Sequence, residues 1–113
     1  MENIVLVIDK ANDFYKKFLD YFKKNKKKII LLAFPKEEEV EEYWHFLFSL
    51  GEELQKAKVS FSIGLEKGSL FSLLNLVETI SCEMVILPKS KFLLLGEEYD
   101  DFLKELNCPL LIY

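Results

Sequence analysis

The residues best placed to do chemistry are two lysines that follow a short buried strand. Residues 84–87 are an apolar run that Pro88 ends, and Lys89 and Lys91 come directly after it. In an open parallel sheet, ligands bind at the carboxyl end of a central strand. All 15 basic residues are lysines, so an anion has to be held by lysine point charges or by backbone N–H groups. Residues 81–96 are therefore the candidate anion site.

Other reactive side chains do not form a catalytic set. His45 is the only histidine, so no second histidine supports a catalytic or ligand role for it. The spacing of Cys82 and Cys108 matches no metal-binding or redox motif, and we expect reduced thiols. The sequence therefore predicts no catalytic residue and no metal site, and it favours a protein that is not an enzyme.

Length and composition indicate one folded domain over residues 1–113. Half of the residues are apolar and 30% are charged, which suits a chain that buries its own core. The net charge of −4 argues against nucleic acid as a partner. No apolar run approaches the ~18 residues of a membrane helix, and residues 1–9 lack the pattern of a signal peptide. We therefore expect a cytoplasmic protein with no membrane contact.

The elements that position the lysines alternate between strands and helices. Apolar runs predict strands at residues 4–8, 29–34, 59–65, 84–87 and 109–113. Helical spacing predicts helices from Asn12 into the lysine run 23–28, and at residues 36–58, 70–81 and 96–106. This order favours an α/β fold: a single three-layer, doubly wound domain with a five-stranded parallel sheet and helices on both faces.

Three small residues have expected local roles. Gly51 lies within the longest helix, where close packing on the sheet would explain a glycine. Gly68 is free to take a positive φ, and Ser69 is placed to cap the third helix.

The buried face of the longest helix is expected to consist of Val40, Trp44, Leu47, Gly51 and Leu54.

Six short segments, in chain order, resemble the universal stress protein family. They are I-V-L-V-I-D near the start, A-K-V-S-F-S-I after the long helix, E-K-G-S, E-M-V-I-L-P, L-L-L-G, and C-P-L-L-I-Y at the end. The resemblance covers the chain from end to end. It implies the Rossmann-like strand order 3-2-1-4-5, as in adenine nucleotide alpha hydrolase-like domains, and a homodimer.

The nucleotide motif of that family is degenerate in this chain. Nucleotide-binding members carry Gly-x2-Gly-x9-Gly-Ser/Thr after the fourth strand, where backbone N–H groups cradle phosphates. Asp9 matches the family's acid beside the adenosine, and Gly96 matches the third glycine. Pro88, which has no N–H, replaces the first glycine, the second has no counterpart, and Glu97 replaces the Ser/Thr. The resemblance therefore implies a lost ATP site.

Charge also disfavours phosphate at the start of the last helix. A helix N-terminus attracts a phosphate by about 0.3–1 kcal/mol. A carboxylate about 6 Å away repels it by about 3 kcal/mol at an effective dielectric constant of about 20. Glu97 and Glu98 open this helix, so we expect repulsion to outweigh attraction.

These observations predict a non-catalytic, universal stress protein-like homodimer that acts as a binding or interaction protein without a cofactor. The last strand is apolar, and in the implied order it lies at the sheet edge, where an unpaired strand invites pairing. Its two-fold copy would satisfy it, while a further protein partner stays open. The residues of this dimer edge are Pro109, Leu110, Leu111, Ile112 and Tyr113.

Two alternative functions stay open. The first is an adenine-nucleotide binder with ATP as cofactor, in which Asp9 contacts the adenosine and Lys89 and Lys91 hold the phosphates, because lysines, Lys10 among them, line the predicted crevice. A mixed-charge, solvated rim explains the same lysines. The second is a phosphoacceptor receiver domain, suggested by V-L-V-I-D-K, although Lys10 takes the position of a required second acid.

The implied strand order also concerns the cysteines. Cys82 and Cys108 each lie two residues before one of two neighbouring parallel strands. We therefore expect the two thiols to lie close together. A disulfide and a pair of small buried side chains both stay open.

Overall fold

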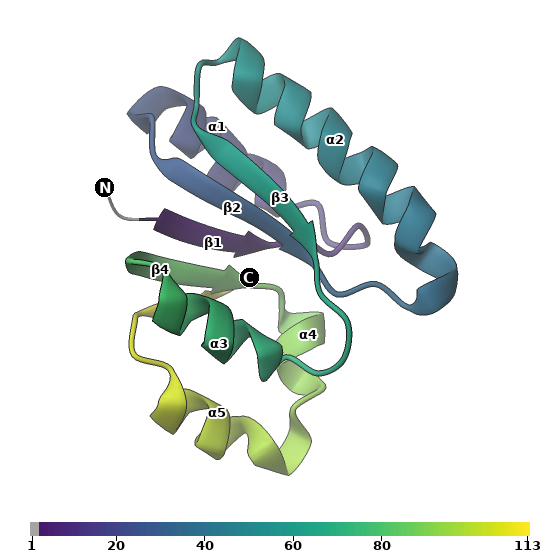
Figure 1. The fold of residues 1–113 in the computed structure, drawn as a ribbon, viewed down its shortest axis with the longest axis vertical. Helices are drawn as coiled ribbons and strands as arrows, with labels where there is room; N and C mark the ends of the chain where they lie inside the picture. Colours follow the sequence, from purple (N-terminus) through teal and green to yellow (C-terminus); the bar gives the residue numbers. More distant parts are fainter. Residues whose placement is uncertain (1–2) are drawn as a thin grey trace.

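The computed structural model of the protein describes residues 3–113. Within this range, strands and helices alternate along the chain, as predicted (Figure 1). The strands are β1 (Asn3–Val7), β2 (Lys28–Ala33), β3 (Phe61–Leu65), β4 (Cys82–Leu87) and β5 (Leu110–Ile112). The α-helices are α1 (Tyr15–Asn25), α2 (Val40–Lys56), α3 (Ser72–Thr79), α4 (Lys89–Leu93) and α5 (Tyr99–Glu105), with 3-10 turns η1 (Glu37–Glu39) and η2 (Gly96–Glu98).

The strands form one parallel sheet in the order β3-β2-β1-β4-β5, which confirms the prediction. Helices α1 and α2 cover one face of the sheet, and α3 and α5 cover the other (Figure 1). Within residues 3–113, no helix is both long enough and apolar enough to cross a bilayer.

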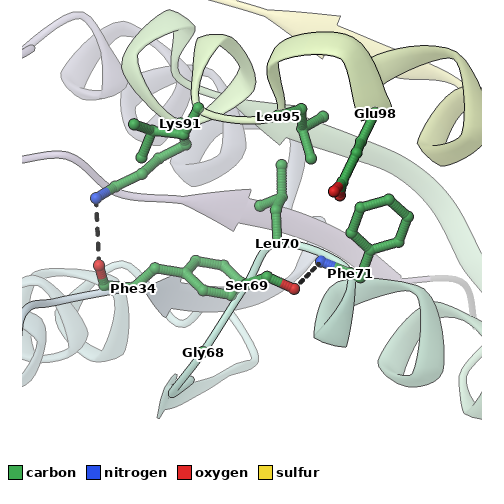
Figure 2. A pocket seen from close by; sticks show the side chains of 9 residues that line it. Phe34, Gly68, Ser69, Leu70, Phe71, Lys91, Leu95 and Glu98 are labelled. Carbon is green, nitrogen blue, oxygen red and sulfur yellow. Dashed lines mark hydrogen bonds between the residues drawn. The ribbon is translucent and has the colours of Figure 1, made fainter.

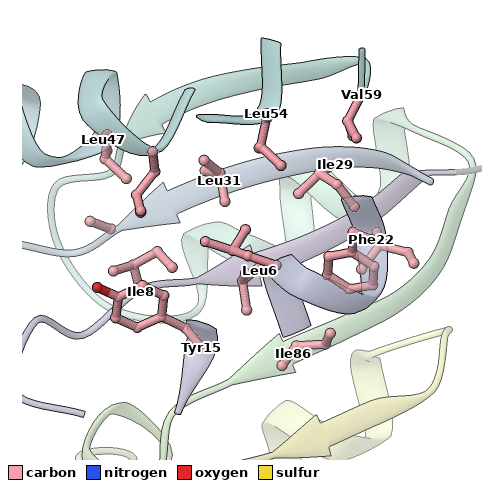
Figure 3. Packing of buried hydrophobic residues seen from close by; sticks show 14 of the residues in the cluster. Leu6, Ile8, Tyr15, Phe22, Ile29, Leu31, Leu47, Leu54, Val59 and Ile86 are labelled. Atoms are coloured by element: carbon pink, nitrogen blue, oxygen red, sulfur yellow. The ribbon is translucent and has the colours of Figure 1, made fainter. Parts of the chain in front are cut away.

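Strand β1 is the centre of the sheet because both of its faces are apolar. Leu6 and Ile8 face α1 and α2, whereas Val5 and Val7 face α3 and α5, and all four are fully buried. Figure 3 shows the first face, where strand residues pack under Leu47 of α2 and around side chains of α1. A continuous apolar run is expected of a strand that is covered on both sides.

Helix α1 begins later and ends earlier than the sequence predicts. The Asn12 side chain does not cap the helix; its Oδ1 accepts from the N–H of Phe14 at 3.2 Å within the preceding turn. The chain leaves the helix at Lys26, which takes a left-handed conformation (φ 53°). The lysine run therefore divides between the helix, the turn and β2, which begins at Lys28.

The long helix packs on the sheet through a glycine contact, as predicted. A Cβ on Gly51 would lie 2.7 Å from Cε2 of Phe61 in β3, so no larger residue fits without a shift. The buried face of α2 is rotated from the predicted one. Tyr43 and Leu50 are buried, whereas Trp44 is 36% exposed and stacks on Phe48 at the surface.

The segment after Pro88 is helical, although the sequence predicts no helix between residues 88 and 96. It contains α4, for which Pro88 is the N-cap, and η2 follows at Gly96. The predicted last helix is thus a 3-10 turn followed by α5. Gly68 takes a positive φ of 90°, as predicted, and Oγ of Ser69 accepts from the N–H of Phe71 at 3.3 Å in the turn before α3.

Candidate functional site

The candidate site lies at the carboxyl ends of β1 and β4, the two neighbouring strands at the centre of the sheet. The chain leaves β1 towards α1 on one face, and it leaves β4 through α4 towards α5 on the other face (Figure 1). Such a reversal opens the crevice in which doubly wound proteins bind ligands. Asp9 follows β1 and Pro88 follows β4, so these two residues lie at the carboxyl ends of the two central strands.

The carboxylate of Asp9 is bonded within the chain. Its Oδ1 accepts from the backbone N–H of Ala11 at 2.9 Å, and its Oδ2 accepts from the hydroxyl of Ser90 on α4. The two donors lie on opposite sides of the crevice, one in the loop after β1 and one in α4. Asp9 therefore connects the loop after β1 with α4 through these two hydrogen bonds.

The backbone N–H groups at the start of α4 are also used. Pro88 has no N–H, and Lys89 donates its N–H to the carbonyl of Tyr113 at 2.6 Å. Lys91 and Phe92 donate theirs to the carbonyl of Pro88, at 3.0 and 3.2 Å. Amides that cradle a phosphate have to point freely at the ligand, and these three do not.

Lys89 and Lys91 are not brought together. Nζ of Lys91 donates to the carbonyl oxygen of Phe34, at the end of β2, at 3.2 Å (Figure 2). Lys89 instead lines a groove on the α1 side of the sheet, beside Tyr113. The two lysine side chains therefore lie on different surfaces of the protein, one beside Phe34 and one beside Tyr113.

Lys10 faces α2 rather than the crevice. It forms an ion pair with Glu42, and its Nζ lies 5.8 Å from the ring centroid of Tyr43 and 5.6 Å from that of Phe46. Its backbone N–H donates to the Tyr43 hydroxyl at 3.2 Å. Burial is the main cause that raises the pKa of Tyr43, so this hydroxyl stays protonated at neutral pH.

A small cavity remains beside Lys91, between α4 and the turn before α3. Its volume is about 160 Å³, below the 300–1,000 Å³ that is typical of ligand sites. The side chains of Lys91 and Glu98 line it together with Phe34 and apolar groups (Figure 2). Of the two acids that open the predicted last helix, Glu98 lines this cavity and Glu97 does not.

Gly96 lies where the chain turns from α4 into η2. Its φ is 55°, a left-handed conformation that favours glycine. This turn is the local reason for glycine at this position.

Among residues 3–113, no group of three or more His, Cys, Asp and Glu side chains is arranged to hold a metal ion.

Comparisons with solved structures identify the fold. The chain superposes on a universal stress protein family protein from Burkholderia pseudomallei with a TM-score of 0.70 at 13% identity, covering 99% of this chain and 95% of that one. The chain has the universal stress protein fold. A universal stress protein in complex with cAMP gives 0.68 at 12% identity (99% and 95% covered), and a family protein from Arabidopsis thaliana with AMP bound gives 0.63 at 13% (99% and 90%). No family model and no curated protein sequence matches the chain.

The sequence did not predict the side-chain contacts that join α4 to the loops after β1 and β2. Ser90 reaches Asp9 across 81 positions of sequence, and Lys91 reaches Phe34 across 57. The only local signal was a hydroxyl between two lysines after a proline, which is compatible with many surface turns. The contacts follow from the strand order, because β1 separates β4 from β2.

A second candidate surface lies along β5, which forms one edge of the sheet. Leu111 and Ile112 are each 39% exposed, whereas Leu110 is packed against the α3 and α5 side of the core. Tyr113, predicted to belong to this edge, has its side chain buried, with the hydroxyl donating to the carbonyl of Val7 at 2.6 Å. A groove of about 460 Å³ lies between α1 and the strands β4 and β5, and its walls include Phe14, Phe18, Tyr21, Met84 and Leu111.

Proposed function

We propose that this protein is a non-catalytic interaction protein that does not use the nucleotide crevice of its fold. The observation that carries the proposal is the position of α4 across the crevice. Its Ser90 and Lys91 side chains are bonded to Asp9 and Phe34, and the N–H groups of Lys89 and Lys91 are bonded to carbonyls. The Asp9 carboxylate, the Lys91 ammonium and these two backbone N–H groups are thus used within the chain.

The free energy of nucleotide binding would have to offset the loss of these contacts. Freeing one intramolecular hydrogen bond costs about 0.5–1.5 kcal/mol, and about 1.5–3 kcal/mol when a charged group takes part. The bonds to Asp9 and from Lys91 both involve charged groups, although the former is exposed and weaker for that reason. The carboxylates of Glu97 and Glu98, in η2 beyond α4, add repulsion towards a phosphate.

Calorimetric titration with ATP and Mg²⁺, AMP and cAMP tests this proposal. We expect no binding heat at millimolar nucleotide, and no rise in the thermal unfolding midpoint, which reports binding independently. A dissociation constant in the micromolar range for any of the three would refute the proposal. Circular dichroism of the same sample verifies that the protein is folded.

We also propose that the protein is a homodimer that pairs through β5. The strand is bonded to β4 on one side, and its outer edge carries the half-exposed Leu111 and Ile112. Pairing with a two-fold copy would satisfy the edge and extend the parallel sheet of each protomer across the axis. The apolar groove beside Phe14 would lie next to such an interface.

Light scattering after size exclusion tests the dimer. We expect twice the chain mass of 13.3 kDa for the wild type, and the monomer mass for Leu111→Lys, which places a charge on the edge. Phe48→Lys is the matched control, because Phe48 is 58% exposed on α2, far from β5 in the sheet order, and should leave the dimer intact. A monomeric wild type, or dissociation caused equally by the control, would contradict this assignment.

The second candidate function is adenine-nucleotide binding. It is favoured by two solved structures of the same fold, one in complex with cAMP and one with AMP bound, and by the position of Asp9 after β1. In this case α4 would have to shift so that Lys89 and Lys91 reach the phosphates. We then expect micromolar binding of ATP that Lys91→Ala weakens. Binding that this substitution leaves unchanged would argue against the assigned lysine role.

A further inference from the structure

The two cysteines form a close pair at the end of the sheet opposite the crevice. Cys82 is the first residue of β4, and Cys108 lies between α5 and β5. Their sulfur atoms are 3.5 Å apart, although 26 positions separate them in sequence, which confirms the predicted proximity. Both thiols are free and half-buried against the core on the α3 and α5 side.

We propose that Cys82 and Cys108 are a redox site that closes reversibly to a disulfide. The S–S bond is about 2.05 Å long, so the sulfur atoms have to approach each other by about 1.5 Å. Rotation about the side-chain bonds supplies such a movement when the thiols are not enclosed, and both residues are partly exposed. The proposal rests on this geometry and is independent of the proposed nucleotide and dimer functions.

Hydrogen peroxide, or a peroxide of the same class, is the oxidant that the reaction needs. In the first step, one thiol is oxidised to a sulfenic acid, and peroxide is reduced to water. In the second step, the other sulfur attacks the sulfenic sulfur, the S–S bond forms, and the hydroxyl leaves as a second water after taking up the thiol proton. Two thiols and one peroxide therefore give one disulfide and two waters.

The surroundings of the pair indicate the order of the steps. Cys108 donates its S–H to the Cys82 sulfur, and the S–H of Cys82 lies 3.4 Å from the carbonyl of Met84. Burial, with the hydrogen bond to Cys82 as a smaller cause, raises the pKa of Cys108 from 9.0 to about 12. Because the Cys108 S–H donates to the Cys82 sulfur, it would stabilise a thiolate on Cys82, so we expect the first oxidation there. The raised pKa leaves little Cys108 thiolate to attack the sulfenic acid, so we expect a slow second step.

A bridge at this position would hold the shortest strand of the sheet, which lies at an edge. The closed loop contains α4, η2 and α5, and it ends just before β5, a strand of 3 residues. For a loop of about 26 residues, the entropy of closure corresponds to a roughly 400-fold change in the unfolding equilibrium. By linkage, the folded protein should form the bridge more readily than the unfolded chain by the same factor.

Intact mass spectrometry after peroxide treatment and maleimide labelling tests the proposal. We expect the treated wild type to lose two hydrogens and to take up no maleimide, whereas Cys82→Ser and Cys108→Ser each keep one sulfur that cannot close the bridge. Dithiothreitol should restore two labelled thiols. The bridged protein should unfold in urea with an equilibrium constant roughly 400-fold smaller than that of the reduced protein.

Three results would overturn the proposal. The thiols could stay fully labelled after peroxide, the disulfides could form only between chains, or the bridge could form as readily in urea as in buffer. Peroxide treatment of the Cys82→Ser/Cys108→Ser double variant is the control for the stability measurement and should not change its unfolding midpoint. Thiol labelling and mass do not depend on nucleotide binding or on the oligomeric state, since both are read on the denatured chain.

Discussion

Replacing Tyr113 with phenylalanine tests how the edge strand is held to the core. The Tyr113 side chain is 8% exposed, and its hydroxyl donates to the carbonyl of Val7 at 2.6 Å. Its ring stacks on Phe14 with centroids 6.5 Å apart and meets Phe18 edge-to-face at 5.4 Å. Phenylalanine keeps these ring contacts and removes the hydroxyl alone, so Tyr113→Phe isolates one buried hydrogen bond.

The expected cost follows from the burial of both partners. A neutral buried hydrogen bond contributes about 1–1.5 kcal/mol, and Val7 is fully buried in β1. With a urea m-value of about 1.5 kcal/mol/M, the unfolding midpoint of Tyr113→Phe should fall by roughly 0.5–1 M. Tyr113→Ala, which also removes the ring, should cost about 3–5 kcal/mol. The midpoint is measured by circular dichroism, and an unchanged midpoint for Tyr113→Phe would refute the assigned bond.

The same variant makes a prediction at alkaline pH. Burial is the main cause that raises the pKa of Tyr113 above its ordinary value of 10.0. Above that value the unfolded chain loses the phenolic proton while the folded chain keeps it, so the folded state binds more protons and stability falls as pH rises. The loss is about 1.4 kcal/mol per pH unit for one such group.

Urea unfolding between about pH 9 and about pH 11 measures this loss. Burial also raises the pKa values of Tyr15 and Tyr43, so Tyr113→Phe should retain part of the alkaline decline and not all of it. If the wild type and the variant decline equally, the Tyr113 hydroxyl does not hold its proton in the folded state. A steeper decline in the variant would contradict the sign of the argument.

Three further substitutions test the packing and the surface charges. Phe102→Ala should lower the free energy of unfolding by about 3–5 kcal/mol, because Phe102 is fully buried. Leu103→Ala, at a neighbouring residue that is 40% exposed, is the control and should lower it by less than about 1 kcal/mol; urea unfolding compares the two. Gly51→Val should cost about 2 kcal/mol or more, because its Cβ would meet Phe61 at 2.7 Å, and an unchanged midpoint would show that this ring moves freely. Lys10→Gln should change stability by no more than about 0.5 kcal/mol in moderate salt, since its ion pair is exposed; a larger loss would show that the pair is not screened.

The sheet was predictable from the sequence because its signals are local. The strands predicted at residues 4–8, 29–34 and 84–87 are short apolar runs that end at a polar residue or a proline, and alternation with helices permits only a parallel sheet with crossovers. The strand order came from the family resemblance and agrees with the observed pairing. Gly51 was also predictable, since a glycine within a long helix needs a close contact to explain it.

The helix that crosses the crevice was not predictable from periodicity. Helix α4 has 5 residues, fewer than two turns, so it contains no repeat of apolar positions. A proline followed by polar residues is equally compatible with a loop.

The buried face of α2 was predicted incorrectly for a different reason. The helix carries aromatic residues almost all around its axis, so the rotation that buries Tyr43 and leaves Trp44 outside cannot be chosen from spacing alone.

The division between core and crevice makes the nucleotide question testable by substitution. The two buried clusters are built from strand and helix side chains such as Leu6, Leu54 and Phe102, and these hold the sheet and its covering helices together. Ser90 and Lys91 are not members of either cluster, and Ser90 is exposed. Replacing them should therefore open the crevice without unfolding the domain. If nucleotide still fails to bind a folded Ser90→Gly/Lys91→Gly variant, the side chains of residues 90 and 91 are not the cause. The cause then lies in the backbone amides, which are absent at Pro88 and bonded within the chain at Lys89, and in the carboxylates of Glu97 and Glu98.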